Sequence, residues 1–204
     1  MSKFAKLGSV RRSWDTAIIG LLLLVWVFAS LTTSNFLTPL NFSYIFSNTS
    51  EIMIIAFAML FMIILGEIDL SVASILALGS SMLGWSYAKG APIWMAILIC
   101  ILVGTACGFV NGFLVTKLGL GSLAVTIGTL ALYRGIANGL LGENTVNEFP
   151  EFWTSFGFDT IGKSFMPKTL PLIIIFGILF GLLLHKTPFG RRTLAIGQSP
   201  EAAK

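Results

Sequence analysis

The sequence predicts an all-α polytopic membrane protein with about six transmembrane helices. Three observations predict it: 55% of the 204 residues are hydrophobic, only 11% are charged, and apolar runs recur along the whole chain. An ordinary soluble domain carries about 25% charged residues. Because the apolar runs recur, a soluble domain on a single anchor is excluded. Most of the surface is therefore expected to face lipid or other helices.

A membrane-spanning helix needs about 20 predominantly apolar residues at 1.5 Å rise per residue. The chain offers six candidates, of which the third is rich in Gly, Ser and Ala and the sixth is short. They cover residues 16–31, 44–65, 70–88, 93–116, 123–141 and 170–184. The third candidate also fits a re-entrant segment, although a crossing is favoured.

The first candidate follows a basic N-terminus over residues 1–15. Such a basic stretch, an apolar run and the small residue Ala29 also fit a secretory signal cleaved after Val27-Phe28-Ala29. Because five further apolar segments follow, an uncleaved first span is the favoured interpretation.

Charge placement favours six crossings with both chain ends in the cytoplasm. With the N-terminus inside, the outer loop over residues 142–169 carries four acids. The inner segments then hold most of the basic residues, namely Lys3, Lys6, Arg11, Arg12, Lys117, Lys186, Arg191 and Arg192. The net charge of +4 is thus a topology signal, and no nucleic-acid partner is expected.

The loop over residues 142–169 is expected to be extracytoplasmic, and aromatic side chains lie among its acids. They are Phe149, Phe152, Trp153, Phe156 and Phe158. Aromatic residues beside a membrane are typical of an interfacial or amphipathic segment. A docking surface for an extracellular partner is the alternative, and the two interpretations are compatible.

No pattern in the sequence predicts an enzyme, a metal site or a cofactor site. A phosphate-binding glycine loop and a zinc-protease signature are both missing from the 204 residues. The single histidine, His185, is expected at the end of the last span. Cys100 and Cys107 lie in one apolar run and are interpreted as small apolar side chains. Energy for uphill transport would come from an ion gradient or from a partner.

Three charged residues lie where membrane burial would be costly. Glu67 and Asp69 separate the second and third spans, after Gly66. They are read either as capping acids in a cytoplasmic turn or as carboxylates of a broken membrane element facing a cavity. Arg134 lies inside the fifth span and is expected either to reach the interface or to pair internally with one of these acids.

Small and polar residues predict close packing and a possible pathway. Gly104, Gly108 and Gly112 share one helix face of the fourth span, beside Asn111. The fifth segment is rich in Gly and Thr, and Thr126 and Thr129 suit an interrupted helix that lines a pathway.

Three stretches resemble the permease subunits of ATP-binding-cassette importers for monosaccharides, the ribose-type family. They are G-E-I-D-L-S-V-A-S at residues 66–74, V-T-I-G-T-L with Y-R-G at residues 125–135, and T-P-F-G-R-R, A-I-G and P-E-A-A at residues 187–203. Their order and spacing make the match strong. Within this family, two segments resemble the rhamnose and autoinducer-2 branch more than the ribose branch, namely His185-Lys186-Thr187 and Ile196-Gly197-Gln198-Ser199-Pro200.

The resemblance implies that residues 1–204 form a transmembrane permease domain, incomplete at its C-terminus. It also implies a pathway subunit that works with a separate ATPase, a periplasmic or extracellular sugar-binding protein and a second permease subunit. Residues 185–204 would be the cytoplasmic coupling segment, in which Gly197 makes a turn before a helix. Its ATPase contacts would be Glu201, Ala202 and Ala203.

Three residues depart from the pattern of this family. Glu67 and Ala73 stand where glycine is common, and Ser122 stands where proline is frequent. A gradient-driven secondary transporter that uses Glu67, Asp69 or Arg134 remains the alternative function. A coupling segment distinguishes the two, because a gradient-driven carrier has no use for one.

Overall fold

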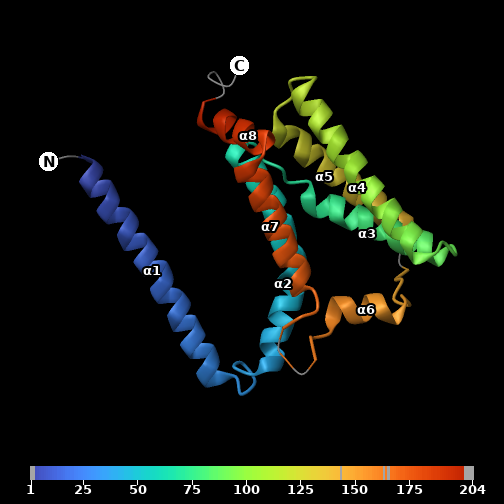
Figure 1. Ribbon diagram of the computed structural model, residues 1–204, viewed down its shortest axis with the longest axis horizontal. Helices are drawn as coiled ribbons and strands as arrows, with labels where there is room; N and C mark the ends of the chain where they lie inside the picture. Colours follow the sequence, from blue (N-terminus) through green and yellow to red (C-terminus); the bar gives the residue numbers. More distant parts are fainter. Residues whose placement is uncertain (1–2, 143, 163, 165, 200–204) are drawn as a thin grey trace. The chain divides into compact units, whose positions relative to one another are not determined.

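The computed structural model describes the backbone of residues 3–142, 144–162, 164 and 166–199. These residues form eight α-helices and one isolated β-bridge, between Thr160 and Pro167. The helices are α1 (Lys3–Thr32), α2 (Pro39–Leu65), α3 (Val72–Ala88), α4 (Ile93–Thr116), α5 (Ser122–Leu141), α6 (Glu151–Phe158), α7 (Leu170–Lys186) and α8 (Pro188–Gln198) (Figure 1). The all-α class is confirmed.

All six expected spans are helical, but they differ in length. Four helices, α1, α2, α4 and α5, are long and apolar enough to cross a membrane. A fifth span is reached if α7 and α8 are taken together, although they meet at a bend of 70°. Helix α3 has only 17 residues, roughly 26 Å at the α-helical rise. Length and composition therefore support four or five crossings among the described residues, and six crossings stay a prediction.

The chain divides into two units, and the first comprises Met1–Asn48 with Thr160–Pro167. No residue in the membrane-length part of α1 is buried, and Leu22 and Leu24 are about 60% exposed. The ring of Trp26 packs against Phe36 and Phe42, with centroids 5.8 and 6.1 Å away. This contact closes the turn between α1 and α2.

The second unit comprises Thr49–Asp159 and Lys168–Lys204, and α3, α4 and α5 form its helical core. Helix α3 packs along both α4 and α5. Leu78, Cys107, Tyr133 and Ala137 make its buried apolar cluster. Gly79 allows a close contact between α3 and α4, since a Cβ there would lie 3.1 Å from the sulfur of Cys100.

The glycines predicted to bring α4 close to its neighbours do so only in part. A Cβ on Gly104 would meet Ile75 of α3 at 3.9 Å. Gly108 and Gly112 have open space instead, since nothing lies within 4 Å of an added Cβ.

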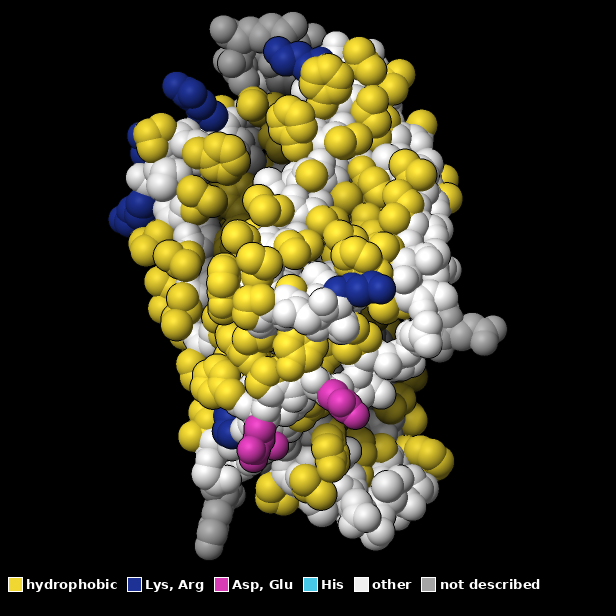
Figure 2. Space-filling model, turned by 90° about the vertical axis from the view of Figure 1, so that its right-hand side faces the viewer, with side chains coloured by type: hydrophobic (Ala, Val, Ile, Leu, Met, Phe, Trp, Pro, Cys, Tyr) yellow, Lys and Arg dark blue, Asp and Glu magenta, His cyan; other side chains and the backbone are white. Residues whose placement is uncertain are grey.

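Residues 49–65 of α2 make a second group within this unit together with α7 and α8, and aromatic rings hold this group together. Phe180 of α7 packs against Phe57 and Phe61 of α2, with centroids 6.3 and 5.8 Å away. Phe61 also contacts Phe189 of α8, at 5.8 Å. Hydrophobic side chains are spread widely over the face shown in Figure 2.

Candidate functional site

The break between α2 and α3 is the centre of the candidate site, and Gly66 creates it. Its φ of 75° is left-handed, a conformation that favours glycine. The amide of Gly66 donates to the carbonyl of Ile63, and the amide of Glu67 donates to that of Met62. This pair of bonds is the Schellman motif, which ends a helix and satisfies its last carbonyls. Residues 67–71 therefore leave α2 as a non-helical link.

Asp69 organises the start of α3. Its Oδ1 accepts from the amide of Ser71 at 2.8 Å and from the hydroxyl of Ser71 at 2.6 Å. The side chain of Asp69 is half-buried, whereas Ser71 is fully buried. Asp69 thus forms a local turn to Ser71 just before α3, but it does not cap the helix, since α3 has no side-chain cap and no acid in its first turn.

From Ser71 a chain of hydrogen bonds crosses the α3–α4–α5 group. Asn111 of α4 donates through Nδ2 to Ser71 Oγ at 2.8 Å. The hydroxyl of Tyr133 on α5 lies 3.1 Å from Asn111 Oδ1 and 3.2 Å from the carbonyl oxygen of Cys107. All three side chains are buried. Buried polar groups linked in this way fix the orientation of three helices, and this Asp69–Ser71–Asn111–Tyr133 series is termed the polar network below.

Side chains in the first turn of α5 form hydrogen bonds to the link at Ile68. Ser122 Oγ accepts from the amide of Ile68 at 3.4 Å. Thr126 Oγ1 donates to the carbonyl of Ile68 at 3.3 Å and lies 2.8 Å from that of Ser122. A proline at residue 122 would have no hydroxyl, so this contact depends on the departure from the family pattern.

Thr129 lies one turn further along α5 and is buried. Its hydroxyl contacts the carbonyl of Val125 at 3.0 Å, within its own helix. Thr129 therefore packs beside the polar network without joining it.

Glu67 and Arg134, two of the charged residues that the sequence singled out as candidates, are not part of this network. Within the described residues, the Glu67 side chain forms neither a hydrogen bond nor an ion pair. Arg134 is exposed on α5 and is likewise outside any ion pair. The expected internal pairing of Arg134 with an acid is therefore not seen. Tyr133 and Ala137 occupy the buried face of α5. Arg134 directly follows Tyr133, so the α-helical rotation of about 100° per residue directs its side chain away from that face.

Within residues 185–204, a helix begins earlier than expected. Thr187 and Pro188 start α8, and the Thr187 hydroxyl accepts from the amide of Gly190 at 3.2 Å. Proline is favoured in the first helical turn, because its missing amide is not needed there. Gly197 therefore lies inside the last turn of α8, and the prediction of a turn at this residue is wrong. Glu201, Ala202 and Ala203 lie outside the described residues.

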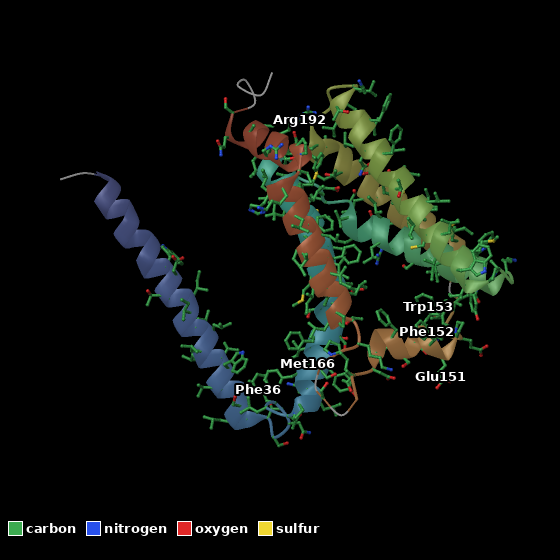
Figure 3. All side chains as sticks on the ribbon, viewed as in Figure 1. Phe36, Glu151, Phe152, Trp153, Met166 and Arg192 are labelled. Carbon is green, nitrogen blue, oxygen red and sulfur yellow. The ribbon has the colours of Figure 1, made fainter. Side chains whose placement is uncertain are left out.

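Helix α8 has a buried and an exposed side. Gly190 and Thr193 are buried, whereas Arg191 and Arg192 are exposed. Figure 3 labels Arg192 on this helix.

The loop over residues 142–169 contains α6 and one exposed charged cluster. Asp159 Oδ2 accepts from Ser155 Oγ at 2.7 Å and from Lys168 Nζ at 3.1 Å. Lys168 also donates to Ser155. The Ser155 hydroxyl first, and the Lys168 ammonium second, hold the pKa of Asp159 below its ordinary value.

Several aromatic residues of this loop are exposed or line a cavity. Phe152 and Phe158 of α6 are 70% and 76% exposed, and Figure 3 labels Phe152 and Trp153. A cavity of about 190 Å³ lies between α6 and the helices α3 and α4. Its walls are Leu83, Ile93, Ile97, Phe149, Trp153, Thr154 and Phe158. The exposed rings fit the expectation of an interfacial segment, which stays a prediction.

Sequence reasoning missed Tyr133 and the bonding role of Ser71 and Ser122. All three lie in or beside the stretches that carried the family resemblance. The signal that could have found them is a small polar or phenolic residue at a helix start or on a buried face. Among the described residues, no group of three or more His, Cys, Asp or Glu could hold a metal ion.

The family model described as "Branched-chain amino acid transport system / permease component" matches residues 41–204. This chain belongs to that permease family. The match covers the polar network, the link and α8. The resemblance inferred from three sequence stretches is thereby confirmed.

Curated relatives cover nearly the whole chain. The autoinducer 2 import system permease protein LsrD of Klebsiella pneumoniae subsp. pneumoniae is 32% identical over 96% of this chain and 60% of its own length. The ribose import permease protein RbsC of Bacillus subtilis is 34% identical over 91% and 57%. LsrD of Yersinia pestis (strain Pestoides F) is 31% identical over 95% and 60%. The chain thus spans about 60% of these relatives. No solved structure matches it.

Proposed function

We propose that this chain forms part of the translocation pathway of an ATP-driven importer for a monosaccharide or a related small polar solute. The family match over residues 41–204 carries the proposal, because similar proteins are named as permeases for ribose and autoinducer 2. The geometry supports it through the polar network, which begins at the non-helical link between α2 and α3. Polar groups at such interruptions are characteristic of transport proteins.

The proposed partners are a separate ATPase subunit, a binding protein that delivers the solute and a second permease subunit. ATP hydrolysis is assigned to the ATPase, and this chain supplies helices and the coupling contact. Residues 185–204 are the proposed coupling segment. Helix α8 supports this assignment, since it carries exposed Arg191 and Arg192 directly after the apolar α7.

The proposed location is the bacterial inner membrane, with the N-terminus in the cytoplasm. Single cysteines at Ser47, Ser155 and Ser199 test the topology by labelling with a membrane-impermeant thiol reagent. Ser155 is expected to label from outside and Ser199 only after permeabilisation. Labelling of Ser199 from outside intact cells would overturn the topology.

A gradient-driven carrier is not favoured, because the similar proteins are named import permeases. Of the residues that such a carrier could use, Glu67 forms no side-chain hydrogen bond or ion pair among the described residues. Asp69 is instead engaged by the amide and the hydroxyl of Ser71. Arg134 is exposed and forms no ion pair among the described residues.

Uptake into proteoliposomes that contain the whole importer tests the proposal. Labelled monosaccharide should accumulate only when ATP is supplied on the side of the membrane where the ATPase subunit lies. A protonophore should leave this uptake unchanged. Uptake that needs no ATP and collapses with the protonophore would sink the proposal.

A charge change in the coupling segment tests the ATPase contact separately. Replacing Ala202 and Ala203 by Asp should abolish co-purification of the ATPase, because two carboxylates would enter the contact. The same changes at Ala88 and Ala91, at the loop between α3 and α4, are the matched control. Unchanged assembly and transport in the Ala202 and Ala203 variant would count against the contact.

A further inference from the structure

Two glycines of α8 allow its backbone to lie directly against the ends of two other helices. A Cβ on Gly190 would lie 2.0 Å from the carbonyl oxygen of Leu184 in α7. A Cβ on Gly197 would lie 2.1 Å from the carbonyl oxygen of Ile64 in α2. Real Cβ atoms essentially never come within 3.0 Å of such atoms. Since both neighbours are backbone, neither can rotate away.

The two glycines are seven residues apart, which is about two helical turns, so they share one face of α8. Other helical glycines lack this property: nothing lies within 4 Å of a Cβ added to Gly181 of α7 or Gly128 of α5. The ring contact between Phe61 and Phe189 adds a second attachment of α8 to α2. Helix α8 is therefore fixed to the C-terminal ends of both α7 and α2.

The contact at Ile64 lies beside the link. The carbonyls of Met62 and Ile63 accept the two hydrogen bonds that end α2. Ile64 directly follows these two residues and lies two residues before Gly66. Only four residues after Ile64, Ile68 is bonded to the first turn of α5 through Ser122 and Thr126. Asp69 then bonds Ser71, the first member of the polar network inside the helical core.

We propose that Gly197 is a positioning residue: its contact with Ile64 transmits a displacement of α8 to residues 67–69 and so to the polar network. The regulatory use of this contact rests on the proposed function, because the ATPase is what would displace α8. The mechanical connection does not depend on it. Gly197 is accordingly assigned to α2 and not to the ATPase surface.

The direct test uses the full chain in lipid nanodiscs with Cys100 and Cys107 replaced by Ala and Glu67→Cys as reporter. A methanethiosulfonate reagent measures the accessibility of this cysteine. Gly197→Ala should change the labelling rate by about threefold or more, within the range of coupling through packed networks. Gly181→Ala is the matched control and should leave the rate unchanged, since its Cβ meets open space. Equal rates in both variants would overturn the proposal.

A second variant decides the case where Gly197→Ala does not fold. Phe189→Ala loosens the other contact between α8 and α2 without introducing an overlap. The reporter rate should then shift while an exposed cysteine at Ser80 on α3 keeps its rate. An unchanged Glu67→Cys rate would contradict the proposed connection.

The assembled importer separates this inference from the proposed function. Gly197→Ala should keep co-purification of the ATPase and lower the solute transported per ATP hydrolysed. Loss of co-purification would place Gly197 on the ATPase surface and overturn the positioning role. If uptake by the unaltered importer does not need ATP but the reporter still shifts, the importer assignment fails and the connection stands.

Discussion

The two helical groups of the second unit are held by different forces. Polar side chains join α3, α4 and α5, with the Ser71–Asn111 hydrogen bond at their centre. Helices α2, α7 and α8 are joined by phenylalanine rings and by backbone approaches at Gly190 and Gly197. A helix group held by hydrogen bonds is destabilised when a bonding partner is removed, whereas a group held by close backbone contacts is destabilised when side-chain volume is added. The two groups should therefore respond to opposite kinds of substitution.

The largest effect is expected from added volume at Gly190. Gly190→Ala should destabilise the protein by about 3 kcal/mol, because the new methyl group overlaps the backbone of α7. Gly181→Ala should instead be neutral or slightly stabilising, since alanine favours helices over glycine. Unfolding in detergent, followed by circular dichroism, measures both. Equal stability of the two variants would contradict the view that close backbone contacts hold α8 against α7.

A smaller loss is expected from a missing partner in the polar network. Asn111→Ala should cost about 2 kcal/mol, because the hydroxyls of Ser71 and Tyr133 both lose a buried partner. Adding volume in the same group, by Gly108→Ala, should be tolerated because nothing lies within 4 Å of that Cβ. A cost for Gly108→Ala that equals the cost for Asn111→Ala would break the comparison.

Tyr133→Phe should have a milder effect than Asn111→Ala. It removes one hydroxyl whose acceptors are 3.1 and 3.2 Å away, and it keeps the ring that packs in the core. The expected cost is about 1 kcal/mol, measured by the same unfolding assay. A double variant of Asn111 and Tyr133 should cost less than the sum of the single variants, because the two share one bond.

The smallest effect is expected at the exposed Asp159 cluster, which belongs to neither group. The pKa of Asp159 is lowered in the folded protein by Ser155 and Lys168. Its contribution is therefore present above the ordinary pKa of a carboxyl, about 4, and is lost as the pH falls through the lower folded value. Asp159→Asn should remove this small acid dependence. Stability at pH 7 should change far less than in Asn111→Ala, because exposed ion pairs contribute little.

The spans could be predicted closely because each apolar run ends at a local signal. The predicted fourth span matches α4 (Ile93–Thr116) at both ends, and α2 ends at Leu65, directly before Gly66. Helices α6 and α8 were missed because neither is a long apolar run. For α8, Thr187-Pro188 is a recognisable helix start, so the sequence contained a signal that hydropathy alone does not detect.

The sequence by itself determined the membrane class, the helical segments and the family, since hydropathy, turn residues and short motifs are local properties. Only the tertiary structure decided which polar residues meet. Ser71 and Asn111 are 40 residues apart, and Asn111 and Tyr133 are 22 apart. It also decided that Gly197 contacts Ile64 from a different helix. Such pairs depend on how helices pack, and residue spacing along one chain does not specify the rotation of one helix against another.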